Sequence, residues 1–211
     1  MSLDVLRSTY FLYVHSIISY GITFWGNSSH SEEMFEIQRR IIRIIINSSK
    51  TASCQQLFKE LNILPTESQY IFSMLLFVTK DKYQFLSNSQ VNNINTRQTS
   101  DLYVPTANLA VYQKGVYYSG IKIYNHLPTA IKDLSGDDNK FKLALRRYLL
   151  HNSFYTLEEY FNTQFTMILI LFILLLMLIL IIVLIIVTVA VLWHYNKAQL
   201  MLNVHLLYLL C

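Results

Sequence analysis

The chain has 211 residues, 14% of them aromatic, and only 5 Gly and 3 Pro, a composition that favours a folded helical domain over a disordered one. Lys197 is the one basic residue beyond position 160, so residues 1–160 carry 16 basic against 13 acidic side chains, a surplus of +3 that permits an anionic partner without requiring one. The two cysteines, Cys54 and Cys211, give no disulfide framework, and a reducing compartment is the default expectation.

The first predicted element is a helix that ends at about Ile22. Ser2 or Asp4 can cap its start, because a side-chain oxygen there accepts a backbone N–H. Residues 10–25 are apolar and follow Arg7, so a secretory signal peptide is the alternative. Asp4 lies where that peptide would have to be basic, however, and no A-x-A-like cleavage site follows. We therefore expect a buried helix.

A second helix is predicted from Ser29 to Ile46. Ser29 and Glu32 have the S-x-x-E spacing of a capping box, in which each side chain accepts the other residue's backbone N–H. The apolar residues that follow recur with a helical period and cover more than half of the circumference. They are Met34, Phe35, Ile37, Ile41, Ile42, Ile44, Ile45 and Ile46.

Three arginines of this second helix, Arg39, Arg40 and Arg43, share one stripe on the opposite side. Such a stripe can contact successive phosphates of RNA or DNA. Glu36 lies on the same stripe, three residues before Arg39 and four before Arg40, and side chains at this spacing form ion pairs on helices. We favour the solvated, ion-paired face and keep weak nucleic-acid binding as the alternative.

The middle of the chain predicts two further helices. One runs from Ser53 to about Leu61, and Pro65 opens the next, with Thr66-Glu67 in its first turn. The side chains expected to bury the longer helix are Tyr70, Ile71, Met74, Leu75, Phe77 and Val78.

From Lys80 to Asn108 the periodicity fades, which predicts a long surface segment. Residues 112–124 suit either a strand pair or a bent helix, and periodicity alone does not decide between them. A turn at 135–138 precedes a last helix. That helix carries Phe141, Leu145, Leu149 and Leu150.

Residues 165–193 are 29 consecutive residues without a charge, and 21 of them are Leu, Ile or Val. As a helix they would extend about 43 Å at about 1.5 Å per residue, against a hydrocarbon core of about 30 Å. We therefore predict one long C-terminal transmembrane helix over 165–193, a junction at 161–164 and a short apolar tail at 194–211. The expected fold class is mainly α, a small helical domain with irregular loops over residues 1–160 followed by this membrane helix.

The expected topology is a single-pass, tail-anchored arrangement in the lipid bilayer, with the domain in the cytosol and Cys211 on the far side. Apart from Lys197 every basic residue precedes the span, and positive charge resists translocation. Asn27 and Asn47 each begin an Asn-Ser-Ser sequence, so both would be glycosylated if the domain reached the lumen. We expect both to stay unmodified.

Short strings along residues 5–160 resemble, in the same order, the C-terminal end of the polyprotein of jockey-like non-LTR retrotransposons, the region after the reverse transcriptase fingers and palm. These strings are His15-Ser16, Ser19-Tyr20-Gly21, Trp25-Gly26, Ile37-Gln38-Arg39-Arg40, Ile42-Arg43, Ser53-Cys54, Leu57-Phe58, Leu61 to Pro65, Thr96-Arg97, Gly120 to Asn125, Leu127-Pro128, Phe141-Lys142, Ser153-Phe154-Tyr155 and Glu158-Glu159.

The resemblance implies a helical thumb and post-thumb segment that follows the catalytic centre. The family's polymerase carboxylates lie upstream, in a Tyr/Phe-x-Asp-Asp hairpin that this chain does not contain. Asp137-Asp138 is no substitute, because Gly136 precedes it instead of an aromatic residue. We therefore expect no enzymatic activity. Residues 165–211 depart from the family's pattern, and either a recruited anchor or a translated repetitive tract explains them.

No other chemistry is indicated by the sequence. The six histidines show no metal-ligand spacing with each other or with a cysteine, and no phosphate-binding glycine motif or G-x-S-x-G string occurs. Cys54 is expected to be a core residue at a helix start. We expect no metal, cofactor or small-molecule substrate.

Three functions stay open at this point. The chain is a non-catalytic remnant of a retrotransposon reverse transcriptase with a membrane anchor, a weak sequence-independent nucleic-acid-binding module that uses Arg39, Arg40 and Arg43, or a tail-anchored protein whose cytosolic domain binds another protein.

Overall fold

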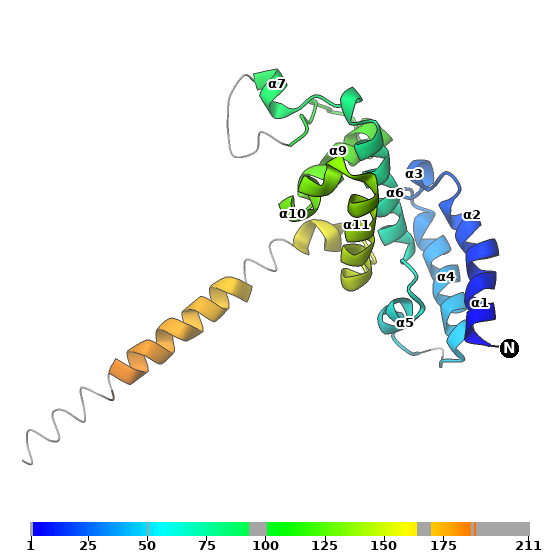
Figure 1. Ribbon diagram of the computed structural model, residues 1–211, viewed down its shortest axis with the longest axis horizontal. Coiled ribbons are helices and arrows are strands. Elements are labelled where there is room, and N and C mark those ends of the chain that lie inside the picture. Colours follow the sequence, from blue (N-terminus) through cyan, green and yellow to red (C-terminus); the bar gives the residue numbers. More distant parts are fainter. Residues whose placement is uncertain (1, 50, 93–100, 164–169, 187, 189–211) are drawn as a thin grey trace, which may run out of the picture. The chain divides into compact units, whose positions relative to one another are not determined.

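The computed structural model describes residues 2–49, 51–92, 101–163, 170–186 and 188. The chain divides into two compact units, Met1–Phe161 and Asn162–Cys211. Within the described ranges the regular structure is helical, without a β-strand, and one isolated antiparallel bridge joins Ser87 to Leu102. The predicted mainly-α class is therefore confirmed (Figure 1).

The N-terminal segment is a continuous helical rod of three elements, α1 (Leu3–Thr9), the π-helix η1 (Tyr10–His15) and α2 (Ser16–Ser19). The rod ends before the predicted boundary because Gly21 has a φ of 61°, in the left-handed region that a residue without Cβ adopts freely. A single further turn, α3 (Ile22–Trp25), follows.

The next helix, α4 (Ser31–Ile46), begins two residues later than predicted. The backbone N–H and the Oγ of Ser31 both donate to the carbonyl of Ser28, so the chain is still turning at Ser29 and the predicted capping box does not form. The predicted C-terminal end is confirmed. Asn47 adopts a φ of 54° there, and the backbone N–H groups of Asn47 and Ser48 satisfy two of the last carbonyls in a Schellman motif.

The buried face of α4 is narrower than predicted. Ile37 and Ile44, which were expected on the apolar face, have exposed fractions of 47% and 74%, whereas the polar Gln38 is buried. The helix packs on one side only, against α1, α5 and α6. Its buried apolar side chains are Phe35, Ile42 and Ile45.

Two helices follow at the predicted places, α5 (Cys54–Leu61) and α6 (Thr66–Lys80), with Pro65 before the first turn of α6. Helix α6 contacts α2, α3, α4, α9 and α11, so it is the central element of the first unit (Figure 1). All of its predicted core residues are buried except Phe77, which is partly exposed.

The segment after α6 is more helical than predicted. Gly115 separates α8 from α9, so the bent helix is the correct alternative for residues 112–124. Residues 93–100, within the predicted surface segment, lie outside the described residues. The elements here are η2 (Lys82–Gln84), α7 (Asn88–Asn92), α8 (Ala110–Lys114) and α9 (Val116–His126).

The first unit closes with α10 (Thr129–Lys132), the 3-10 turn η3 (Asp133–Gly136) and α11 (Asp138–Asn152), and residues 157–163 are again helical. Two apolar clusters hold it together. One surrounds α6 with residues of α2, α9 and α11, and the other joins α4 and α5 to Tyr10. A cavity lies where α4 and α6 begin.

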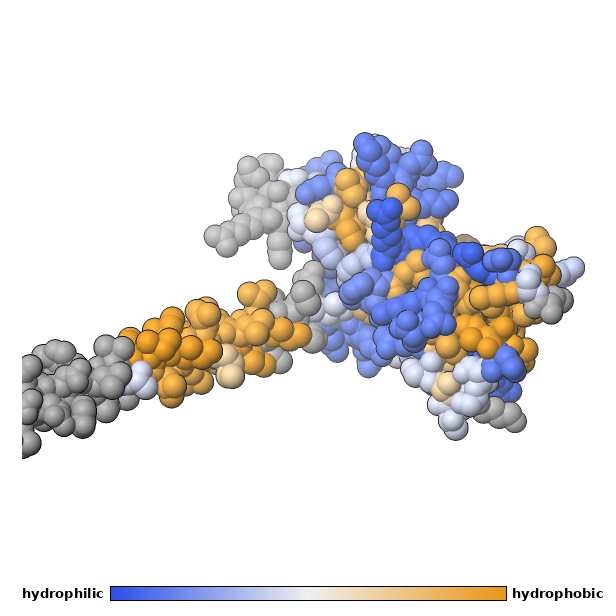
Figure 2. Space-filling model, turned by 60° about the horizontal axis from the view of Figure 1, so that its bottom comes forward, coloured by the Kyte–Doolittle hydropathy of each residue, from blue (hydrophilic) through white to orange (hydrophobic). Residues whose placement is uncertain are grey.

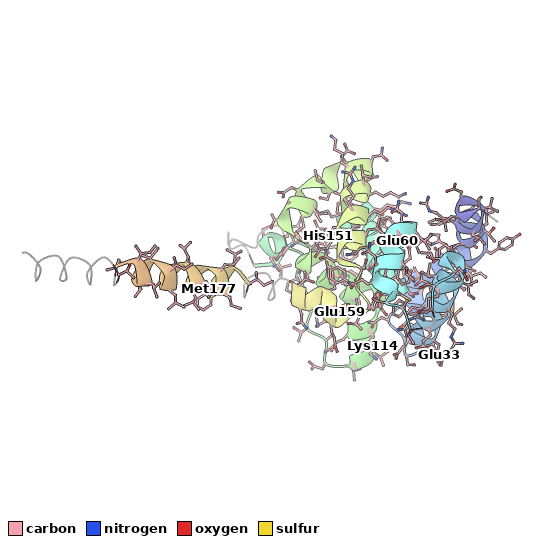
Figure 3. The ribbon with its side chains drawn as sticks, turned by 90° about the horizontal axis from the view of Figure 1, so that it is seen from below. Glu33, Glu60, Lys114, His151, Glu159 and Met177 are labelled. Carbon is pink, nitrogen blue, oxygen red and sulfur yellow. The ribbon has the colours of Figure 1, made fainter. Side chains whose placement is uncertain are left out.

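In the second unit residues 170–186 are helical and consist only of Leu, Ile, Val, Phe and Met (Figure 3). No helix among the described residues is both long enough and apolar enough to cross a membrane. The remaining parts of the predicted span, residues 165–169, 187 and 189–193, and the tail at 194–211 lie outside the described residues.

Candidate functional site

Helix α4 positions the three arginines that the sequence singles out. Its apolar side is held in the core, so Arg39, Arg40 and Arg43 lie on or near the surface. The Glu36 carboxylate pairs with both nearer arginines, at 2.5 Å from Arg39 Nη2 and at 3.7 Å from Arg40 Nη2. The predicted ion-paired face is therefore confirmed for these two residues.

The three guanidinium groups are not equally available. Arg39 is largely covered, with 29% of its side chain exposed, and it lies over the Phe35 ring at 4.9 Å from the ring centroid. Arg43 donates from Nε and Nη2 to the carbonyl of Ala52, at 3.3 and 3.2 Å. Arg40, with 73% of its side chain exposed, has the most freedom to contact a partner.

Arg40 and Arg43 meet at a cavity of about 670 Å³ near the C-terminal end of α4. Its other lining residues are Ile44, Asn47 and Ser48. Arg39 contributes instead to a different cavity, so the predicted stripe is divided between two places. An anion that contacts the stripe would meet two arginines at once, rather than three.

The second cavity, of about 420 Å³, was not predicted from the sequence. It lies where the first turns of α4 and α6 meet the segment after α11. Its lining residues are Asn27, Ser31, Glu32, Phe35, Arg39, Glu67, Tyr155, Thr156, Leu157 and Glu158.

Three buried polar atoms of these lining residues make no hydrogen bond to a described residue: Arg39 Nε, Glu67 Oε2 and Tyr155 Oη. Burial raises the pKa of Glu67 to about 7, and a hydrogen bond with Ser31 acts in the opposite direction. Burial likewise raises the pKa of Tyr155 to about 12. The cavity thus has capacity for further hydrogen bonds, and its lining glutamates outnumber its one arginine.

Asp137 and Asp138 lie at the start of α11. The Asp137 carboxylate accepts the backbone N–H groups of Asn139 and Lys140, at 3.2 and 3.1 Å, as an N-cap does, and these bonds lower the pKa of Asp137. Asp138 lies in the first turn of the helix. The pair flanks a helix start, which differs from the strand hairpin on which polymerase carboxylates are held.

Cys54 begins α5, is buried, and its Sγ lies 3.9 Å from the carbonyl oxygen of Arg39, as expected for a core residue at a helix start. Among the described residues no three His, Cys, Asp or Glu side chains are grouped as metal ligands would be.

In comparisons with known proteins, no family model, curated protein or solved structure matches this chain.

Proposed function

We propose that the chain is a non-catalytic membrane protein, in which residues 165–193 anchor the helical unit to a bilayer by a single pass. The observation that carries this proposal is the helix over 170–186. Its 17 side chains are all apolar, and each has an exposed fraction between 45% and 67%. A helix that is apolar on every side needs apolar surroundings.

The free energy of insertion supports the same assignment. At about −0.5 kcal/mol for each apolar residue, the described helix alone contributes about −8 kcal/mol. Thr188, just beyond it, donates its Oγ1 to the carbonyl of Ile185 at 2.8 Å, so its hydroxyl adds little to the cost of burial.

We further propose that the helical unit derives from the post-palm region of a jockey-like retrotransposon reverse transcriptase. The support is the order of the short strings along residues 5–160, among them Trp25-Gly26 and the Gln38-Arg39-Arg40 string. The chain lacks the carboxylate hairpin of that family, so it should not extend a primer on an RNA template with Mg²⁺ or Mn²⁺. Templated extension that is lost on chelation of the metal would contradict this proposal.

Topology tests the membrane proposal. In microsomes the protein should resist carbonate extraction, added protease should digest the helical unit, and Asn27 and Asn47 should carry no glycan. Asn47 is exposed at the end of α4, so it reports lumenal exposure well. Extraction by carbonate would contradict the anchor, whereas glycosylation of Asn47 would keep the anchor and invert the topology.

Binding of a nucleic acid by Arg39, Arg40 and Arg43 is a second proposal, favoured by the cavity that Arg40 and Arg43 share. Binding should be weak and independent of sequence. Replacing all three by Ala should reduce the slope of log affinity against log salt by about 0.7 to 0.9 for each phosphate that the variant no longer neutralises. Arg40→Ala alone should give most of the change, and Lys122→Ala on α9 is the matched control. An unchanged slope in the triple variant would exclude the stripe.

The third function predicted from the sequence, a cytosolic domain that binds another protein, is compatible with the same anchor. It would use the helical unit without the arginines, so the triple variant would leave it intact.

A further inference from the structure

Beyond Asp4, which is exposed, the outward side of the N-terminal rod and of α3 carries no charge. Within residues 5–24, the exposed side chains are Val5, Ser8, Thr9, Leu12, Tyr13, Ser16, Ile17, Tyr20 and Phe24, which we call the N-terminal face. Its five largest members, from Leu12 to Phe24, have exposed fractions of 66 to 86%. Figure 2 shows apolar surface gathered on the side of the first unit where these helices lie.

The opposite side of the same rod is apolar as well. Tyr10 and Ile18 have exposed fractions of 1% and 2% and belong to the two core clusters. A surface helix of a globular domain normally turns charged and polar residues outward. The N-terminal face therefore has the composition of an interface rather than of a solvated surface.

Two hydroxyl groups of the N-terminal face, those of Thr9 and Ser16, are satisfied within the rod itself. Thr9 Oγ1 donates to the carbonyl of Val5 at 2.9 Å, and Ser16 Oγ donates to that of Leu12 at 2.7 Å. Beside the face, the indole Nε1 of Trp25 donates to the carbonyl of Tyr20 at 2.9 Å. Because these donors already have acceptors, the face can enter an apolar medium that offers none without stranding them.

The chain that connects the first unit to the proposed anchor is short. Phe161 ends the first unit and Phe165 begins the proposed anchor, so four residue steps of at most about 3.6 Å, about 14 Å in all, separate them. A domain of this size has a radius of gyration of about 15 Å. If the second unit is anchored, a short tether therefore holds the first at a high effective concentration beside the lipid.

We propose that the N-terminal face lies on the bilayer surface, with Leu12, Ile17 and Phe24 in the acyl boundary and Tyr13 and Tyr20 at the level of the headgroups. Exposed aliphatic side chains with tyrosines among them suit that interface, and the basic surplus of the first unit favours an anionic leaflet. The inference rests on the proposed membrane function, because the anchor supplies the proximity.

Full-length protein in vesicles of phosphatidylcholine and phosphatidylserine tests the proposal. In a Cys211→Ser background, an environment-sensitive fluorophore is attached to a cysteine at one of three positions: Ile17 on the N-terminal face, Tyr83 on η2, or Met177 in the apolar helix. Tyr83, with an exposed fraction of 82%, is the matched control. Lipids brominated on their acyl chains should quench the labels at positions 17 and 177 and leave the label at position 83 unchanged.

The outcomes distinguish contact of the N-terminal face with lipid from insertion of the anchor. Quenching at 177 but not at 17 overturns the face and leaves the anchor intact. Quenching at 17 without 177 supports contact of the face with lipid and overturns the anchor. Energy transfer between copies labelled at 17, without quenching, shows that a second copy covers the face and overturns the proposal. Phe24→Gln should weaken the quenching at 17, whereas Lys122→Gln should not. Loss of quenching in both variants would show a general effect and would also overturn it.

Discussion

The buried amide of Gln38 offers the most direct test of how the first unit is held together. With an exposed fraction of 1%, it donates from Nε2 to Tyr10 Oη at 2.8 Å and to the carbonyl of Leu64 at 2.9 Å. Its Oε1 accepts the backbone N–H and the Oγ1 of Thr66, both at 2.9 Å. One side chain of α4 thereby joins the N-terminal rod to the start of α6.

Gln38→Leu removes all four hydrogen bonds with little change in volume. The hydroxyls of Tyr10 and Thr66 can rotate, but the carbonyl of Leu64 and the N–H of Thr66 stay buried without a partner. At about 1–3 kcal/mol for each stranded group, the variant should lose about 2–6 kcal/mol of unfolding free energy. Gln55→Leu makes the same chemical change at an exposed position and should stay within about 0.5 kcal/mol of the parent protein.

The assay is urea unfolding of the full chain in detergent, followed by near-ultraviolet circular dichroism of the packed aromatic residues. A double-mutant cycle sharpens it, because Tyr10→Phe should be destabilising in the parent protein and close to neutral in the Gln38→Leu variant. Equal stabilities for the variants at positions 38 and 55 would refute the reasoning.

Substitutions at three further positions test other contacts by the same unfolding measurement. Glu67→Gln should remove a pH dependence of the unfolding free energy. The raised pKa of Glu67 stabilises the fold fully below the unfolded value of 4.5, and about 3 kcal/mol of unfolding free energy is lost as pH rises through about 7. The variant should therefore be the more stable protein at pH 8, and a parallel loss of stability in both proteins would contradict this. Gly26→Ala should reduce the unfolding free energy by about 1–3 kcal/mol, because a Cβ there would lie 2.8 Å from Tyr70 Cγ and closer still to the edge of that ring. A neutral effect would mean that the Tyr70 ring moves aside. Asp137→Ala should destabilise the fold and Asp137→Asn should do so much less, because the amide oxygen can also accept the capping hydrogen bonds. Equal losses in the two variants would contradict the cap.

The helix boundaries could be predicted where a residue with a strong backbone preference starts or ends a helix. Helix α4 ends at Asn47 because asparagine tolerates a positive φ, and α6 starts after Pro65 because the proline ring fixes its φ angle. The start of α4 was misplaced because the capping-box spacing at Ser29 competes with a turn that the sequence does not announce.

The candidate sites depend on tertiary contacts and could be predicted only in part. The pairing of Glu36 with Arg39 and Arg40 is local, so helical spacing was sufficient. The cavity around Glu67 and Tyr155 was not accessible, because it unites segments far apart in the chain. Gln38 lies in one of the strings that carry the family resemblance, but a lone glutamine on a helix gives no signal of burial.

The π-helix η1 has a consequence for how the length of this chain can vary. Tyr10 and Ile18 both point inward although they are eight positions apart in the sequence, a spacing that corresponds to one α-turn of about 3.6 residues and one wider π-turn. A deletion of one residue between them would return the rod to continuous α-helix and keep both inward contacts. The same deletion within α4 would rotate every later side chain by about 100° and carry the arginines toward the core. Relatives of this chain that are one residue shorter should therefore have lost that residue between positions 11 and 15.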